Sequence, residues 1–300
     1  MNRADLQKRE RRHQEDLQRL RGFRPIDDTF MRGLFKDNLP LAEFVLRILT
    51  DKPDLVLTKC ETQADMKRVT GARSICLDAY ATDSTGKKYD IEVQRADNGA
   101  DPHRARYHSS MMDVENLDEK QDYKELPDTY VIFITEKDYY KAGKPLYLVQ
   151  NMNLTLDQPF GDGAHILYVN GEYRDDSDLG KLMHDFNCTD AADMNFELLA
   201  EKTRYLKENP KGVSEMCKVM EDLRDESYAE GRAEGRAEGR AEGRELGLAE
   251  GRARTLFTQI QKKYAKGKSL DQMAEELEEE KESLMQQEAE QLYQHMKKSL

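Results

Sequence analysis

The sequence predicts an α/β domain followed by a helical, partly low-complexity extension. Three observations lead to this prediction. Apolar residues recur at helical spacing over residues 30–49. Three strand-like segments follow, then a helical segment and a nearly continuous apolar strand, which gives the order helix, three strands, helix, strand. Beyond residue 225 the composition changes to repeated Ala-Glu-Gly-Arg units and then to an acidic tail.

The composition narrows the class of protein. The chain has 300 residues, of which 38% are hydrophobic and 35% charged, as expected for a globular centre with long charged extensions. No apolar run approaches the roughly 18 residues of a membrane span, and the N-terminal segment lacks the apolar stretch of a secretory signal. We therefore expect a cytoplasmic protein without membrane contact. The four cysteines form no CxxC pair, which argues against a zinc site and against a disulfide framework.

The net charge of −12 argues mildly against tight, non-specific DNA binding, because phosphate neutralisation supplies much of that affinity. The charge is unevenly distributed, however. Residues 1–25 are Arg-rich, whereas residues 275–290 are strongly acidic. The net charge therefore does not describe the surface that would contact a ligand.

Helical segments begin the chain. Residues 1–22 are polar and charged and predict a helix whose thin apolar stripe lies on the surface or pairs with another element. A globular domain is expected over residues 23–225. A helix start at residues 25–28 and helical spacing over residues 30–49 open this domain.

Strands and helices follow in the globular domain. Short apolar or alternating runs bounded by turn residues predict strands, and longer runs with a period of 3.6 predict helices. The run at 130–135 is nearly continuously apolar, which is typical of a strand buried on both faces. We expect strands at 55–59, 73–83, 88–94, 130–135, 146–149 and 164–169, and helical segments at 102–118 and from 178 to about 224.

A compact turn joins the second and third predicted strands into a hairpin. If Gly86 takes the left-handed position of a three-residue loop, Asp83 pairs with Lys87. Counting outward from this pair places Glu92 opposite Asp78. The hairpin therefore predicts two carboxylates side by side.

The opposed carboxylates of Asp78 and Glu92 predict a metal site. Directly opposed residues on one sheet face have Cβ atoms roughly 4.5–5.5 Å apart, so the two charges repel unless a cation lies between them. Mg²⁺ favours oxygen ligands and commonly uses one or two carboxylates. A metal held there can polarise a scissile phosphate and lower the pKa of a bound water that attacks in line. Gln94, on the same strand face as Glu92, is placed to orient that water or a phosphate oxygen.

The same residues carry a family resemblance. Asp78, a short hairpin and then Glu92-Val93-Gln94 resemble the PD-(D/E)XK nuclease motif in its ExQ form, and the order of elements is similar to the αβββαβ core of that restriction-endonuclease-like fold. The resemblance covers about residues 24–255 and implies a mixed central sheet flanked by helices. Four further stretches are similar to the Rpn-type recombination-promoting nucleases, also described as PD-(D/E)XK family transposases: FMRGLFKD near residue 30, RSICLDAYATDSTGKKYDIEVQ, HRARYHSSM and DYKELPDTYVIFI.

The resemblance implies roles for the hairpin residues. Asp78 and Glu92 would be metal ligands, for Mg²⁺ or Mn²⁺, and Gln94 stands where the wider superfamily often has Lys. Gln94 cannot supply the positive charge of that Lys. The Pro of the motif is also absent, since Leu77 stands before Asp78.

Further candidates lie on the neighbouring helical segments. Arg104, Tyr107 and His108 share one helical face by their i,i+3 and i,i+4 spacing, so they would line the path of the phosphate. Glu43 precedes the first strand. It is either an additional acidic ligand, as in many relatives of the superfamily, or a residue on the polar side of its helix.

A low-complexity repeat at 226–253 predicts a helix or a linker. Ala-Glu-Gly-Arg recurs four times from Ala229 to Arg244 and again at 249–253. On a helix, like charges lie four residues apart, and each Gly costs about 1 kcal/mol relative to Ala. Such a helix gains stability by pairing with a second chain in a homo-oligomer; the alternative is a soluble spacer. Residues 254–300 predict an acidic helical tail.

The predicted function is a Mg²⁺-dependent endonuclease that nicks or breaks DNA and thereby promotes recombination, a role implied by the resemblance. Two alternatives stay open. An inactive relative would bind DNA or protein through an oligomerising tail, as the acidic charge and Gln94 suggest. A defence or toxin nuclease would be activated by assembly, with the repeat as its regulator.

Overall fold

The computed structural model describes residues 3–66, 75–95, 97–267, 269 and 272. The chain divides into two compact units, Met1–Asp225 and Glu226–Leu300. The first unit contains the sheet. The described part of the second unit is mainly the continuation of one long helix, α7 (Pro210–Ala265).

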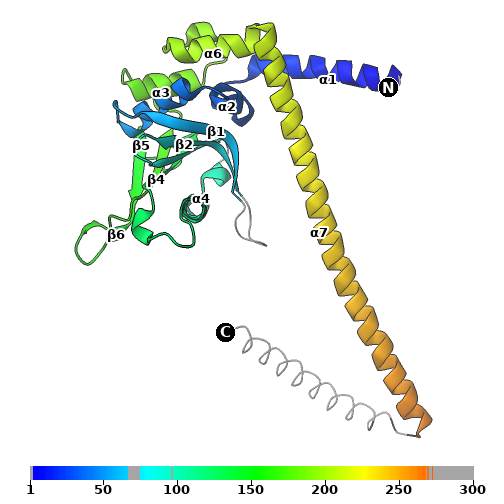
Figure 1. The fold of residues 1–300 in the computed structure, drawn as a ribbon. Coiled ribbons are helices and arrows are strands. Elements are labelled where there is room, and N and C mark those ends of the chain that lie inside the picture. The colour runs from blue at the N-terminus through cyan, green and yellow to red at the C-terminus, as the bar shows by residue number, and fades with distance from the viewer. Residues whose placement is uncertain (1–2, 67–74, 96, 268, 270–271, 273–300) are drawn as a thin grey trace. The chain divides into compact units, whose positions relative to one another are not determined.

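A six-stranded sheet forms the centre of the first unit (Figure 1). Its strands, in chain order, are β1 (Leu57–Met66), β2 (Ile75–Asp83), β3 (Lys88–Gln94), β4 (Thr129–Thr135), β5 (Leu146–Gln150) and β8 (Ala164–Asn170). Their order across the sheet is β1-β2-β3-β4-β8-β5. The pairs β1–β2, β2–β3 and β5–β8 are antiparallel, whereas β3–β4 and β4–β8 are parallel. The predicted α/β fold with a mixed sheet and flanking helices is confirmed.

Helices cover both faces of this sheet. The helices of the first unit are α1 (Arg3–Gly22), α2 (Asp28–Phe35), α3 (Leu39–Thr50), α4 (Pro102–Asn116), α5 (Asp178–Phe186), α6 (Glu197–Glu208) and the start of α7. Shorter elements are η1 (Asp97–Ala100), η2 (Tyr123–Glu125), η3 (Ala191–Asp193) and the two-residue strands β6 (Met152–Asn153) and β7 (Gln158–Pro159).

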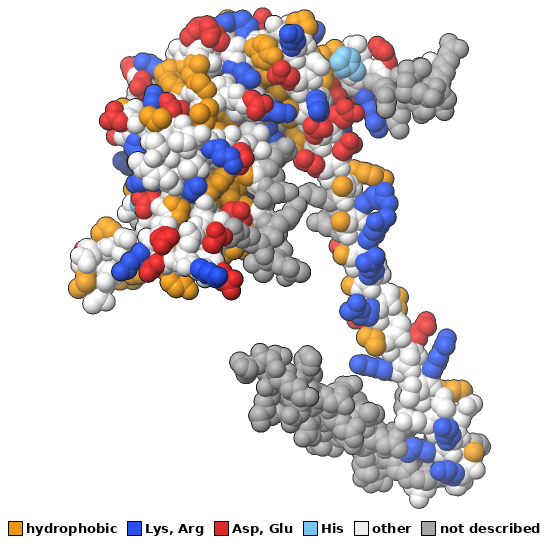
Figure 2. All heavy atoms as spheres, viewed as in Figure 1, with side chains coloured by type: hydrophobic (Ala, Val, Ile, Leu, Met, Phe, Trp, Pro, Cys, Tyr) orange, Lys and Arg blue, Asp and Glu red, His pale blue; other side chains and the backbone are white. Residues whose placement is uncertain are grey.

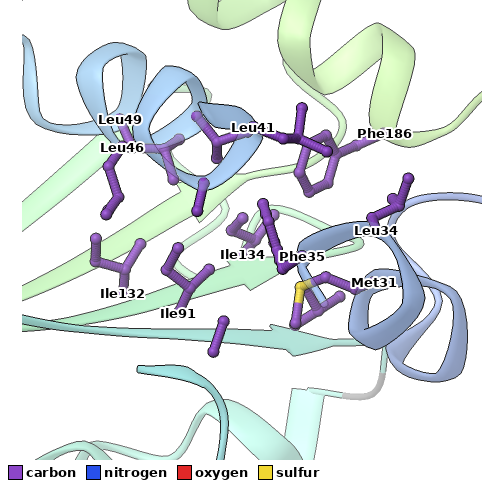
Figure 3. Close-up of a cluster of buried hydrophobic side chains, with 14 of the residues drawn as sticks. Met31, Leu34, Phe35, Leu41, Leu46, Leu49, Ile91, Ile132, Ile134 and Phe186 are labelled. Carbon is purple, nitrogen blue, oxygen red and sulfur yellow. The ribbon is translucent and has the colours of Figure 1, made fainter. Parts of the chain in front are cut away.

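Two apolar clusters lie on opposite faces of the sheet because side chains alternate along each strand. Ile91, Ile132 and Ile134 belong to the cluster under α2, α3 and α5, where they lie close to Leu46 and Phe186 (Figure 3). The intervening residues of β4 belong to the smaller cluster with α4; its fully buried members include Leu77, Met112, Val131 and Phe133. α4 therefore covers the face to which Asp90 and Glu92 point.

The helical spacing at 30–49 is divided between two helices. α2 ends at Phe35, and Asp37 takes a left-handed conformation with a φ of 52°. The Asn38 side chain then accepts a hydrogen bond from the Leu41 N–H at 3.4 Å and caps α3. Pro40, in the first turn of α3, is the sequence signal for this break, because Pro is favoured at a helix start.

The first strand extends well beyond its predicted bounds of 55–59. β1 runs from Leu57 to Met66 and pairs with β2 along nearly its whole length. Its C-terminal half is largely polar, so apolar runs alone did not reveal it. The third strand, in contrast, has the predicted bounds of 88–94.

The N-terminal helix α1 pairs with α7, which was one of its two predicted environments. Leu20 is 2% exposed. The Asp16 carboxylate, on a residue that is 5% exposed, forms an ion pair with Arg224 at 2.6 Å. These contacts attach α1 to the last helix of the first unit.

The repeat is helical throughout. α7 continues through it to Ala265, and Gly267 then has a positive φ of 74°. Most of the predicted acidic tail, residues 273–300, lies outside the described residues. Among the described residues, no helix is both long and apolar enough to cross a membrane.

Candidate active site

The β2–β3 hairpin places Asp78 beside Glu92 as its register predicted. Ala81 pairs with Tyr89, and the Asp83 N–H donates to the Lys87 carbonyl oxygen at 3.0 Å. Gly86 has the positive φ, 90°, that the turn requires. The same register sets Asp78 opposite Glu92.

Hydrogen bonds hold these two carboxylates against the hairpin backbone. The Asp78 N–H donates to Glu92 Oε1 at 3.1 Å, and the Val93 N–H donates to Asp78 Oδ2 at 3.3 Å. Each carboxylate is thus fixed by the strand that carries the other one.

The carboxylate face of the hairpin is buried under α4. Asp78, Asp90 and Glu92 are 6%, 0% and 1% exposed. Burial, and then the charge of Glu92, raises the pKa of Asp78 well above its usual value. Burial, and then Asp78, has the same effect on the pKa of Asp90. Burial and the neighbouring Asp90 raise the pKa of Glu92 to about 8. Water does not stabilise the ionised forms of these carboxyl groups, so their protonated forms are favoured when no cation is bound.

Arg104 and His108 on α4 contact the carboxylates directly. Arg104 Nη2 donates to Glu92 Oε2 at 2.9 Å, and Arg104 Nε donates to His108 Nε2 at 3.2 Å. His108 Nδ1 lies 2.9 Å from Asp90 Oδ2. The helical face predicted to line the phosphate path is thus brought to the carboxylates.

His108 and Tyr107 differ from Arg104 in what they can contact. His108 is 2% exposed, so its ring faces Asp90 and not a substrate. Tyr107 is half-buried and packs against the apolar cluster beneath α4. Of the three α4 candidates, Arg104 has the access that phosphate contact requires, since its side chain is 40% exposed.

Two residues of α2 complete the site, and the sequence prediction did not include them. Arg32 Nη2 lies 3.4 Å from Asp78 Oδ1, and Arg32 Nε donates to Asp28 Oδ1 at 2.9 Å. Asp28 also raises the pKa of Asp78, after the larger effects of burial and Glu92. The i,i+4 spacing of Asp28 and Arg32 was visible in the sequence, but their approach to β2 is a tertiary contact.

The comparison with protein families agrees with this geometry. Residues 36–179 match the family model described as PD-(D/E)XK nuclease family transposase. The chain is therefore similar to this nuclease family over that segment. A search of curated proteins and a search of solved structures gave no match.

The nuclease segment contains the hairpin and α4 but not α2. It begins at residue 36, after Asp28 and Arg32, and ends at the start of α5. The predicted resemblance to PD-(D/E)XK family transposases is therefore confirmed over the sheet that carries the carboxylates. α2 lies outside the matched segment.

Gln94 lies at the edge of the nuclease site. Its Nε2 donates to Glu92 Oε2 at 3.4 Å, and its side chain is half-buried. Gly99 in η1 leaves room for it, because a Cβ at residue 99 would overlap Gln94 Oε1. The amide is thus held next to the carboxylates by a glycine that the sequence prediction did not single out.

Glu43 does not join the site. Its Oε2 accepts a hydrogen bond from the Leu57 N–H at 2.8 Å, and its Oε1 forms an ion pair with Arg47 at 2.6 Å. α3 packs on the sheet face opposite α4. The structure thus gives Glu43 a role in joining α3 to β1, and Asp28 is the additional acidic residue near Asp78.

The donor set fits a hard divalent cation. The carboxylates of Asp78 and Glu92 adjoin one another, and Asp90 and His108 lie beside Glu92, with atoms of Asp90, Glu92 and His108 within 4.8 Å of one another. Asp90 Oδ1 is buried and has no hydrogen-bond partner among the described residues. A second group consists of His184, Asp185 and Cys188. Its carboxylate, that of Asp185, already accepts hydrogen bonds from the backbone N–H groups of Asn195 and Phe196.

Proposed function

We propose that this protein is a metal-dependent DNA endonuclease that hydrolyses phosphodiester bonds with Mg²⁺ or Mn²⁺. The observation that carries the proposal is the buried pair of carboxylates, Asp78 and Glu92, on one hairpin of a PD-(D/E)XK nuclease segment. Carboxylate oxygens are the ligands that both cations accept. A bound cation would supply charge stabilisation at the phosphate and acidify a water.

The remaining site residues bind and orient the substrate in this proposal. Arg104 keeps one edge on Glu92 and turns its exposed edge toward a non-bridging phosphate oxygen, because a guanidinium donates through several N–H groups at once. The Gln94 amide, adjoining Glu92, orients the attacking water by accepting or donating a hydrogen bond. Arg32 and Asp28 adjust the charge at Asp78.

The transposase description of the matched family supports DNA as the proposed substrate and recombination as the proposed setting. We further propose that the protein acts in the cytoplasm and that α7 joins copies into a homo-oligomer. The net charge of −12 leaves the phosphate contacts to local basic groups such as Arg104.

Plasmid cleavage tests this proposal. The wild-type chain is expected to nick or linearise supercoiled DNA with Mg²⁺ or Mn²⁺ and not with a chelator. Asp78→Asn and Glu92→Gln preserve shape but remove a ligand charge, so each should reduce cleavage by at least about 100-fold, the upper end of losses seen for metal-site partners. Glu43→Gln is the matched control and should cleave normally. Normal cleavage by the Asp78 and Glu92 variants would falsify the site.

The alternative function is that of an inactive relative that binds DNA or protein. Gln94 in place of Lys favours it, because the amide carries no charge toward a phosphate. Calorimetric titration separates the two functions. An inactive relative would bind neither Mg²⁺ nor Mn²⁺ with DNA present, whereas the endonuclease binds one or both.

A further inference from the structure

A buried chain of hydrogen bonds runs from Asp90 to Glu92 through α4. Asp90 Oδ2 meets His108 Nδ1 at 2.9 Å, His108 Nε2 meets Arg104 Nε at 3.2 Å, and Arg104 Nη2 meets Glu92 Oε2 at 2.9 Å. Asp90 and His108 are 0% and 2% exposed. Neither side chain can reach a substrate, so their contribution passes through Arg104.

The protons in this chain have only one consistent arrangement. Arg104 Nε always carries a hydrogen, so His108 Nε2 must accept from it. An imidazole with a bare Nε2 carries its hydrogen on Nδ1, and that hydrogen points at Asp90 Oδ2. A doubly protonated ring would set an N–H group against the Arg104 N–H. His108 is therefore neutral and in the Nδ1–H tautomer.

We propose that Asp90 and His108 are positioning residues, which hold Arg104 on Glu92 and aim its exposed edge at the substrate phosphate. The phosphate-binding part rests on the proposed nuclease function. Among the described residues, none accepts a hydrogen bond from Arg104 Nη1, on a side chain that is 40% exposed. Because a carboxylate has about four lone-pair directions, Glu92 can keep Arg104 and still bind a cation.

Histidine NMR tests the hydrogen-bond chain without any need for activity. The full chain carries six histidines, and ¹⁵N labelling of their rings distinguishes protonated from bare nitrogens. The His108 signals are those lost in His108→Asn. At neutral pH we expect a protonated Nδ1 and a bare Nε2. An Nε2–H tautomer, or protons on both nitrogens, overturns the proposal.

Two substitutions of His108 separate positioning from packing. Gln presents an amide near the place of Nε2 and can still accept from Arg104, whereas Asn presents one near Nδ1 and can only bond Asp90. Removing a residue that hydrogen-bonds and orients a metal ligand typically lowers metal affinity or activity about 10–100-fold. We expect a loss of kcat/KM in this range for His108→Asn and for Asp90→Asn, and a smaller loss for His108→Gln. Equal losses in both His108 variants mean that the ring only fills space, which overturns the proposal.

A Mn²⁺ titration distinguishes positioning from direct ligation. His108→Asn should bind Mn²⁺ as the wild type does, because the proposal places His108 behind Arg104. Weaker Mn²⁺ binding makes His108 a ligand and overturns it. His103→Asn, the same change on the exposed first turn of α4, is the control for all measurements and should alter none. If the wild type neither binds nor cuts DNA, the proposed function fails. The tautomer of the His108 ring still tests whether the hydrogen-bond chain from Asp90 through His108 to Arg104 exists.

Discussion

At the scale of single residues, Glu92 connects the parts of the site. One of its oxygens accepts the Asp78 N–H, and the other accepts from Arg104 and Gln94. Its side chain is 1% exposed, so these contacts take the place of water around its carboxyl group. They do not offset burial and the neighbouring Asp90, which together raise its pKa to about 8.

This raised pKa makes the stability of the metal-free protein depend on pH. Between about 4.5, the ordinary Glu value, and about 8, the folded protein keeps a proton on Glu92 that the unfolded chain releases. The free energy of unfolding should therefore fall as pH rises through this window, by at most about 1.4 kcal/mol per pH unit for one group. Urea unfolding in chelator at pH 5, 6.5 and 8 measures it.

The Glu92→Gln variant isolates the Glu92 part of that fall. It should show a shallower decrease than the wild type, because one titrating group is gone, while Asp78 and Asp90 still contribute in the same direction. Glu43→Gln should follow the wild-type slope. Parallel wild-type and Glu92→Gln curves would show that Glu92 does not bind this proton.

Divalent cations should restore the free energy of unfolding that the protein loses as pH rises. A cation that binds only the folded chain stabilises it by about 3 kcal/mol at 100 times its dissociation constant. We expect Mn²⁺ to raise the melting temperature of the wild type more at pH 8 than at pH 6, because protons compete for Glu92 below its pKa. Thermal unfolding with and without Mn²⁺ measures this effect. An equal rise in Glu92→Gln would place the cation elsewhere.

At the scale of elements, the β2–β3 hairpin determines the site through its turn. Gly86 has a φ of 90°, and an added Cβ there would meet nothing within 4 Å. Gly86→Ala thus tests backbone strain alone, and should lower the free energy of unfolding by about 1 kcal/mol. Gly22→Ala, equally open but without a positive φ, should cause no comparable loss in the same urea experiment. Equal stability of both variants would mean that the turn tolerates Ala.

The hairpin was predictable because its information is local. One glycine and a three-residue loop fix the register, and the register alone sets Asp78 opposite Glu92. The burial of that face was not predictable from the strand, since alternating polar residues usually face water. It depends on α4, which packs over β3 and β4.

Three residues of the site were absent from the sequence prediction because their contacts also depend on how helices pack on the sheet. Asp28 and Arg32 reach Asp78 only because α2 packs across the sheet, and Asp90 matters only because His108 faces it. Their positions along the sequence carry no sign of these contacts. The sequence left two roles open for Glu43, because its position before β1 does not reveal its hydrogen bond with the Leu57 N–H.

At the scale of the whole molecule, α7 belongs to two regimes. Its first turns are part of the first unit, where Met216, Val219 and Met220 are buried. Over 226–267 the described side chains are exposed or half-buried, and basic side chains follow α7 in Figure 2. A helix that buries no apolar face depends on propensity, and a glycine in every fourth position weakens it.

A partner helix would stabilise the repeat, and its glycines can show whether one exists. We expect the full chain to be larger than a monomer by light scattering and a chain ending at Tyr228 to be monomeric. Gly231, Gly235, Gly239 and Gly243 have open space around them within one chain, so Ala at all four should raise helicity. If helices of two chains approach closely along these glycines, the same four methyl groups should also reduce the oligomeric mass.

A control for this experiment uses glycines further along the same helix. Gly247→Ala with Gly251→Ala makes the same kind of change at the end of the repeat, where the Ala-Glu-Gly-Arg order is interrupted. It should raise helicity and leave the mass unchanged. A monomeric wild type would instead assign the repeat to the role of a spacer, because a helix without a partner has no interface for the methyl groups to disturb.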